Sequence, residues 1–167
     1  NLIAGDRVLI TDHGYNACSN AARFFAEKTG AVVDLINLPF PGSDSNEVIE
    51  RILKGCTSRT RILLIDHITS PTALIMPLED IVPAVQQRGI QVLVDGAHAP
   101  GMLPLRLAEL GADYYTGNCH KWMCAPKGTA FLYVRSEHQS NLHPLTISHG
   151  MNRPVGESTR FRLEFDW

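Results

Sequence analysis

Residues 113–128 read Asp-Tyr-Tyr-Thr-Gly-Asn-Cys-His-Lys-Trp-Met-Cys-Ala-Pro-Lys-Gly, and the rest of the chain is best interpreted outward from this stretch. An apolar run leads into a polar turn that holds Lys121, and Trp122 follows directly. An amine between aromatic groups is partly desolvated, and it loses its proton more easily than a fully hydrated lysine. A neutral amine can attack a carbonyl and form a Schiff base. The alternative for Lys121 is an ordinary surface-loop lysine.

A second informative stretch lies upstream, where residues 92–98 read Val-Leu-Val-Asp-Gly-Ala-His. Here a buried apolar strand is expected to run directly into the carboxylate of Asp95. The interval between Asp95 and Lys121 leaves room for a loop, one helix and one strand. Taken alone, Asp95 is better explained as a helix cap after a strand, and Lys121 is what favours a functional role.

Strands and helices alternate along the chain. The predicted strands cover 8–11, 31–38, 61–66, 90–95, 112–116 and 129–134, and the predicted helices cover 17–29, 44–54, 77–89 and 105–110. Near-continuous apolar runs such as Arg61 to Asp66 are typical of parallel strands that are buried on both faces. The pattern predicts an α/β three-layer sandwich with a mostly parallel central sheet. From Arg135 onward the sequence is polar and irregular.

In open parallel sheets, ligands bind beyond the carboxyl ends of the strands. Polar residues follow four of the predicted strands at that edge: His13 and Tyr15; His67 to Ser70; Asp95 and His98; Asn118 to Lys121. Four strands that deliver polar side chains to one edge predict a binding site there.

Composition narrows the possible functions. The 167 residues fit one domain, and a net charge of −2 gives no electrostatic case for nucleic acid or an anionic membrane as a partner. No apolar run is long enough to span a bilayer, and no secretory signal opens the chain, so we expect a cytoplasmic protein. Only 19% of residues are charged, which suits a domain whose faces are covered by other polypeptide.

The four cysteines show no Cys-x-x-Cys spacing, and free thiols are therefore expected. A zinc site built from Cys119, Cys124 and His120 has little support, because two soft ligands without a second pair are a weak signal. The sequence also lacks the glycine-rich dinucleotide fingerprint after its first strand, the nucleotide phosphate-binding loop and the Gly-x-Ser-x-Gly nucleophile turn.

The two stretches together resemble the class V aminotransferase family of pyridoxal-phosphate enzymes, which includes cysteine desulfurases and isopenicillin N epimerase-like proteins. The family pattern is a strand ending in Asp-Gly-Ala-(His or Gln), then a strand leading to a turn that ends in His-Lys. Here these are residues 95–98 and 118–121. Gly-Asn-Cys-His-Lys-Trp followed by Ala-Pro-Lys-Gly looks most like the epimerase-like branch. The resemblance covers nearly the whole chain and implies the type I pyridoxal-phosphate fold.

The resemblance assigns the residues nearest the cofactor ring. Lys121 would form the Schiff base with pyridoxal 5'-phosphate, and Asp95 would pair with the pyridinium nitrogen and keep it protonated. His98 would lie near the phenolic oxygen of the cofactor. Ser70 stands where cysteine desulfurases carry an asparagine that faces the same oxygen, and serine is a shorter donor.

The resemblance also assigns residues around the rest of the cofactor. Asn118 and His120 match positions that contact the phosphate, and both can donate hydrogen bonds. Either Tyr15 or His13 would stack on the ring. We favour Tyr15, because an ungapped match places Gly14 at the position of the stacking histidine of desulfurases.

Both ends of the chain look cut, since it begins at Asn1 close to a strand and stops on the alternating run Phe161 to Phe165. We therefore expect residues 1–167 to be part of a cofactor-binding large domain, with an N-terminal segment and a C-terminal small domain absent. By resemblance, the complete protein would be a homodimer.

The expected function is that of a pyridoxal-phosphate-dependent enzyme that acts on an amino acid or amine. Transamination, epimerisation, C–S bond cleavage and desulfuration all begin when the substrate amine replaces the lysine in its bond to the cofactor. The alternative is a catalytically inactive α/β domain with a structural or dimerisation role. The presence of both Asp95 and Lys121 favours the enzyme.

Overall fold

The structure is a computed structural model that describes residues 2–41, 44–156 and 158–166. The chain divides into two compact units, Asn1–Tyr133 and Val134–Trp167. The first unit carries the sheet and all the residues that the sequence analysis assigned to a site. In the second unit, the described elements are α5 (Ser136–Gln139), the 3-10 helix η1 (His149–Asn152) and α6 (Arg160–Asp166).

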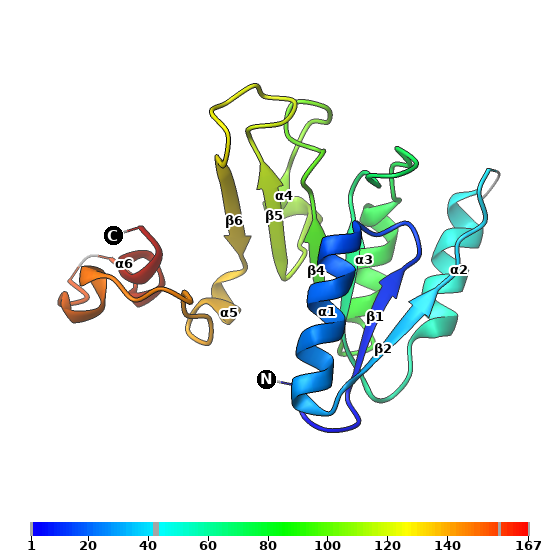
Figure 1. Cartoon of the computed structure of the whole chain (residues 1–167), viewed down its shortest axis with the longest axis horizontal. Helices are drawn as coiled ribbons and strands as arrows, with labels where there is room; N and C mark the ends of the chain where they lie inside the picture. The colour runs from blue at the N-terminus through cyan, green and yellow to red at the C-terminus, as the bar shows by residue number, and fades with distance from the viewer. Residues whose placement is uncertain (1, 42–43, 157, 167) are drawn as a thin grey trace. The chain divides into compact units, whose positions relative to one another are not determined.

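A sheet with helices on both faces makes up the first unit (Figure 1). Its elements are, in chain order, β1 (Arg7–Thr11), α1 (Asn16–Thr29), β2 (Val32–Ile36), α2 (Ser45–Gly55), β3 (Thr60–Asp66), α3 (Leu78–Gln86), β4 (Gln91–Asp95), α4 (Leu107–Leu110), β5 (Tyr114–Asn118) and β6 (Ala130–Val134). The strand order is β2-β1-β3-β4-β5-β6. The first five strands pair in parallel, and β6 runs in the opposite direction (Figure 1). The predicted α/β class with a mostly parallel sheet is confirmed.

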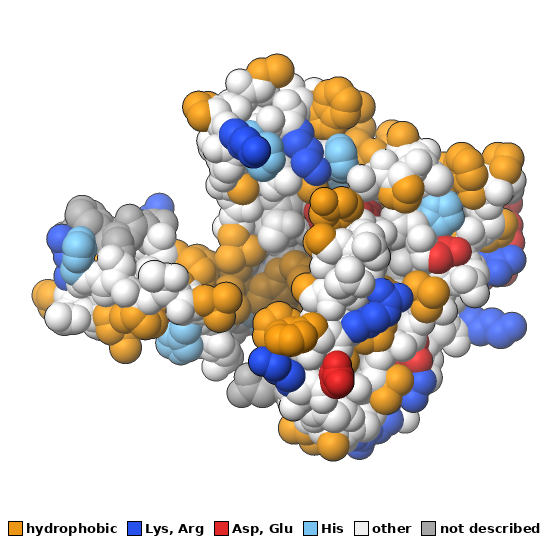
Figure 2. Space-filling view, viewed as in Figure 1, with side chains coloured by type: hydrophobic (Ala, Val, Ile, Leu, Met, Phe, Trp, Pro, Cys, Tyr) orange, Lys and Arg blue, Asp and Glu red, His pale blue; other side chains and the backbone are white. Residues whose placement is uncertain are grey.

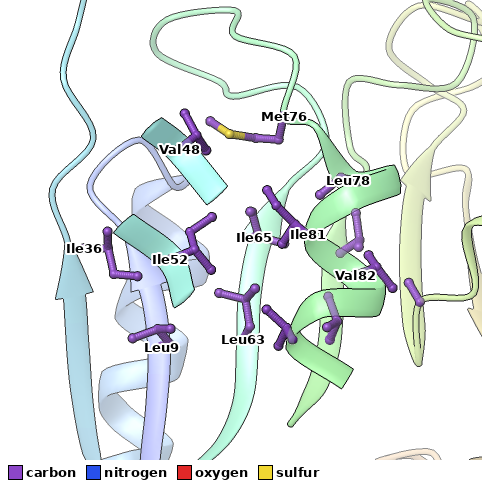
Figure 3. Packing of buried hydrophobic residues seen from close by; sticks show 14 of the residues in the cluster. Leu9, Ile36, Val48, Ile52, Leu63, Ile65, Met76, Leu78, Ile81 and Val82 are labelled. Atoms are coloured by element: carbon purple, nitrogen blue, oxygen red, sulfur yellow. The ribbon is translucent and has the colours of Figure 1, made fainter. Parts of the chain in front are cut away.

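The core lies between the sheet and helices α2 and α3 (Figure 3). Because side chains alternate along a strand, Leu63 and Ile65 of β3 point to this side and are fully buried. They meet Ile52 of α2 and Ile81 of α3. Burial of such side chains stabilises the fold by about 1.5–3 kcal/mol each.

The opposite face of the sheet is only partly covered. Ile62 and Leu64 of β3 point to this side and are half-buried, so the prediction that β3 is buried on both faces is met on one face only. The spacing of apolar residues predicted helix α1 correctly, but Phe24 and Phe25 of that helix are 52% and 55% exposed. Figure 2 shows hydrophobic side chains on the surface of this unit. The physical reason is that α1 alone is too narrow to cover this face.

The helix boundaries follow local signals. Asp44 caps α2 by accepting a hydrogen bond from the Glu47 amide (2.8 Å), as the spacing of these two residues predicted. Gly30 ends α1 in the left-handed conformation at φ 72°. The helix expected over 105–110 is shorter, at Leu107–Leu110, and the alternating run Phe161 to Phe165 lies in helix α6.

In the part of the chain that the structure describes, no helix combines the length and the apolar character needed to cross a bilayer.

Candidate active site

The strand register brings carboxylates to one edge of the sheet. Asp66 ends β3 and Asp95 ends β4, and the two are partners in the parallel register. Asp95 is in turn the register partner of Thr116 in β5. In the space-filling view, Lys, Arg and His side chains gather over the loops that follow β4 and β5 (Figure 2). The predicted edge therefore carries both acidic and basic groups.

Lys121 and His98 meet at this edge from two different loops. The Lys121 Nζ atom lies 3.2 Å from His98 Nε2, and the Trp122 indole N–H donates to His98 Nδ1 at 3.1 Å. Burial lowers the pKa of His98, the nearby Lys121 lowers it further, and Asp95 opposes them. The sequence analysis predicted both Lys121 and His98 as site residues, but it missed the role of Trp122 as a hydrogen-bond donor.

The loop after His98 packs directly against the lysine turn. Gly101 has φ 85°, a left-handed conformation that glycine adopts without strain. A Cβ atom built on Gly101 would lie 2.8 Å from the Trp122 carbonyl carbon. Glycine is therefore required here so that the two backbones can approach each other.

The structure separates the two candidates for a stacking residue. Tyr15 is half exposed, and the Lys121 Nζ atom lies 5.9 Å from the centre of its ring. His13 is buried, and its ring nitrogens bond the Thr72 hydroxyl (2.8 Å) and the Leu38 carbonyl (3.0 Å). Only Tyr15 of the two therefore lies beside the lysine.

Asp95 is 7% exposed and both of its carboxylate oxygens accept hydrogen bonds. The Ala97 amide donates to Oδ1 (3.0 Å), and the Cys18 thiol of α1 donates to Oδ2 (3.2 Å). Burial, and then the Asp95 charge, raise the pKa of Cys18 to about 12. Cys18 is therefore a protonated donor, and the sequence analysis did not identify it because no motif surrounds it in the first turn of α1.

Asp66 is a second carboxylate that the sequence analysis treated only as a strand end. It is 5% exposed and accepts a hydrogen bond from the Tyr15 backbone N–H. Burial, followed by repulsion from Asp95, raises the pKa of Asp66 to about 7. The hydrogen bond from Tyr15 thus links the turn after β1 to the carboxyl end of β3, where Asp66 lies. The signal that could have revealed it is its position, since it ends an apolar strand as Asp95 does.

We expect Asp66→Asn to stabilise the protein more at pH 8 than at pH 4. The folded-state pKa of about 7 lies above that of an unfolded aspartate at about 3.9, so the folded state binds the extra proton between these values. The unfolding free energy of the wild type therefore falls as the pH rises through this window. Asparagine does not titrate, so the variant does not show this decrease. At about 1.4 kcal/mol per pKa unit, the gain in unfolding free energy should be roughly 2–4 kcal/mol larger at pH 8.

Urea unfolding of both proteins without cofactor, at the two pH values, measures this difference. Asp80→Asn is the matched control for removal of a carboxylate, because Asp80 is exposed on α3, and its effect should change less between the two pH values than that of Asp66→Asn. Parallel pH profiles for the wild type and Asp66→Asn would contradict the assignment.

The other predicted residues are placed more loosely. His120 is half-buried and its Nδ1 atom bonds the Thr129 carbonyl (3.0 Å). Asn118 is half-buried at the end of β5, and Ser70 is exposed in the turn after β3. Within the described residues, none of these three side chains bonds to Lys121, His98 or Asp95. Their predicted contacts with a cofactor remain predictions.

Two further features complete the description of this edge. His67, one of the polar residues after β3, is buried and bonded to the Tyr115 hydroxyl (2.7 Å), which gives it a structural role. Among the residues that the structure describes, no group of three or more His, Cys, Asp or Glu side chains is arranged to hold a metal ion.

Comparisons with known proteins agree with this fold. A sequence profile described as Aminotransferase class-V matches residues 1–164. The chain is 36% identical to isopenicillin N epimerase of Amycolatopsis lactamdurans and 34% identical to a probable chloroplastic L-cysteine desulfhydrase of Arabidopsis thaliana. These matches cover 95% and 93% of this chain, but only 40% and 35% of the relatives.

Among solved structures, the cysteine desulfurase CsdA of Escherichia coli matches with a TM-score of 0.83 at 23% identity, over 98% of this chain and 42% of that one. The cystine C–S lyase C-DES, in complex with its product cysteine persulfide, matches with a TM-score of 0.81 at 24% identity, over 89% and 40% of the two chains. At these identities the likeness establishes the fold.

The mostly parallel α/β sheet is the fold shared with these solved structures, and Lys121 and Asp95 lie at its carboxyl edge. The profile match over nearly the whole chain makes the assignment specific: the chain belongs to the aminotransferase class-V family. It spans less than half the length of the curated relatives named above.

Proposed function

We propose that this chain is part of a pyridoxal 5'-phosphate-dependent enzyme that acts on an amino acid or amine, with Lys121 as the Schiff-base lysine. The observation that carries the proposal is the approach of Lys121 Nζ to His98 Nε2 (3.2 Å) at the edge where the buried carboxylate of Asp95 ends β4. Family membership supports it, and so does a solved structure of the same fold, a C-DES mutant with glycine covalently linked to its pyridoxal-phosphate cofactor.

The residues at this edge fit the chemistry of the cofactor. Lys121 supplies the amine that the aldehyde requires, and Asp95 supplies a negative charge for the ring nitrogen. Tyr15 supplies an aromatic face next to the amine, because its ring centre lies 5.9 Å from Lys121 Nζ. When bound, the cofactor would accept electron density from a substrate bond next to the amine.

The protein's own groups then have separate tasks. Asp95 would favour a proton on the ring nitrogen of the bound cofactor, and the Ala97 amide and the Cys18 thiol hold the carboxylate in place. The Lys121 amine, when free, would be the base that moves protons at the substrate carbon. His98 stays beside the lysine and orients it.

The proposed substrate is an amino acid or amine, and the reaction belongs to the group that includes C–S cleavage, epimerisation, desulfuration and transamination. Relatives with names in this group, an epimerase and a desulfhydrase, are 36% and 34% identical to the chain. C–S cleavage of a cysteine-like substrate is the first reaction to assay, because cysteine desulfhydrases recur among the relatives.

The test uses the full-length protein that contains this chain. Pyridoxal 5'-phosphate should produce a visible absorbance band, borohydride should remove it, and peptide mapping should find the reduced cofactor on Lys121. A panel of amino acids, assayed for sulfide, keto acid and racemised product, then identifies the reaction. A label on Lys127 in place of Lys121 would overturn the assignment.

A further inference from the structure

His98 has hydrogen-bond partners at both ring nitrogens, and one of them fixes its proton. The Trp122 Nε1 atom lies 3.1 Å from His98 Nδ1. An indole N–H can only donate, so His98 Nδ1 must be the acceptor and carries no hydrogen. A neutral imidazole whose Nδ1 accepts has its hydrogen on Nε2. The contact with Trp122 therefore selects one tautomer of His98.

This tautomer constrains Lys121. His98 Nε2 lies 3.2 Å from Lys121 Nζ, and its N–H must donate across that distance. A lysine ammonium has three donors and no acceptor, whereas the uncharged amine offers a lone pair. His98 can therefore accept the hydrogen bond from Trp122 and donate one to Lys121 at the same time only when the lysine is uncharged. The uncharged amine is the form that attacks a carbonyl.

The surroundings of His98 agree with a neutral ring. Burial lowers its pKa, and Asp95 is the charged group that acts in the opposite direction. The Trp122 ring is 53% exposed, so core packing does not account for its position. Its ring centre lies 6.3 Å from that of His98 at a tilt of 50°, which leaves the edge-on N–H contact as its main interaction with that ring.

We propose that Trp122 is a positioning residue: its indole N–H holds His98 in the Nε2–H tautomer, and His98 in turn favours the uncharged form of Lys121. The tautomer follows from the geometry alone. The consequence for cofactor capture rests on the proposed function of Lys121.

The first experiment reads the tautomer directly in the full-length protein without cofactor. Nitrogen NMR of histidine-labelled protein distinguishes a protonated from an unprotonated ring nitrogen, and His98→Gln assigns the signals of His98. We expect the wild type to show the Nε2–H tautomer. Trp122→Phe keeps an aromatic ring but removes the donor, so His98 should then exchange between tautomers and its pKa should rise. Met123→Ala, in the same turn and exposed, should leave the His98 signals unchanged.

The second experiment measures how fast Lys121 captures pyridoxal 5'-phosphate, followed by the growth of the visible band. At neutral pH, Trp122→Phe should react about five- to tenfold more slowly, the equivalent of one hydrogen bond of ~1 kcal/mol. The deficit should shrink as the pH rises, because the lysine then loses its proton without help. In a His98→Gln background, Trp122→Phe should have no further effect, since its action passes through His98.

The outcomes separate the two proposals. An Nδ1–H tautomer in the wild type, or identical His98 signals in the wild type and Trp122→Phe, would overturn the role of Trp122. So would equal capture rates for the wild type and Trp122→Phe. Absence of any cofactor adduct on Lys121 in the wild type, together with an intact Nε2–H tautomer, would instead refute the proposed function.

Discussion

Lys121→Ala is expected to abolish turnover and the visible absorbance of the bound cofactor. Alanine can neither form the covalent bond to the aldehyde nor move protons at the substrate carbon. Loss of a positioned acid–base group alone costs about 10²–10⁴ in rate, and loss of the covalent link adds to it. We therefore expect a decrease in kcat of about ten-thousandfold or more, which corresponds to at least ~5 kcal/mol of barrier.

Absorbance spectra and initial rates of the two full-length proteins measure this effect. Lys127→Ala is the matched control, because Lys127 lies in the same turn but is exposed. It should keep both the visible band and the turnover. A Lys121→Ala protein that still binds the cofactor covalently would show that another amine serves, and the proposed function would then have to be reassigned.

Asp95→Asn is expected to lower turnover by roughly 4 kcal/mol of barrier, about a thousandfold, while the cofactor stays bound. The amide keeps the shape of the side chain but loses the negative charge that favours a proton on the ring nitrogen. The Ala97 amide can still donate to the amide oxygen, so the local turn should persist. Cofactor affinity and kcat, measured separately, distinguish loss of charge from loss of structure.

Asp66→Asn is the comparison variant for this prediction, because Asp66 is the register partner of Asp95 on the neighbouring strand. It removes a carboxylate from the same edge but leaves the Asp95 charge in place. Its effect on kcat should be at least about tenfold smaller, a difference of ~1.4 kcal/mol. Near-normal turnover by Asp95→Asn would mean that Asp95 is not the partner of the ring nitrogen.

The electrostatics of the edge explain why two adjacent carboxylates can coexist there. Asp95 accepts hydrogen bonds from the Cys18 thiol and the Ala97 amide. Asp66 receives the Tyr15 amide, but burial and the neighbouring charge raise its pKa to about 7. Asp66 is therefore the member of the pair that takes up a proton more readily than an ordinary aspartate.

Local sequence signals were sufficient for most of the fold. The capping pair Asp44 and Glu47, the helix-ending Gly30 and the apolar runs of β3 and β4 each act over a few residues, so their effects can be predicted without a structure. These local signals were not sufficient where long-range contacts decide whether a side chain is buried. Phe24 and Phe25 fit the predicted apolar spacing of α1, yet both are about half exposed, whereas Ser19 and Ala26 of the same helix are buried.

The sequence by itself determined the family and the mostly parallel sheet, because each depends on residues that lie close together in the chain or in a fixed motif. The roles of Asp95 and Lys121 are predictions from the same motifs. Only the tertiary structure shows that Tyr15 lies near Lys121 whereas His13 bonds to Thr72 and Leu38, since both residues follow β1 and only their long-range partners differ. It also added three contacts that no motif marks: Cys18 with Asp95, Asp66 with Tyr15, and Trp122 with His98. These pairs are distant in sequence, and it is the register of parallel strands and the close approach of two loops that bring them together.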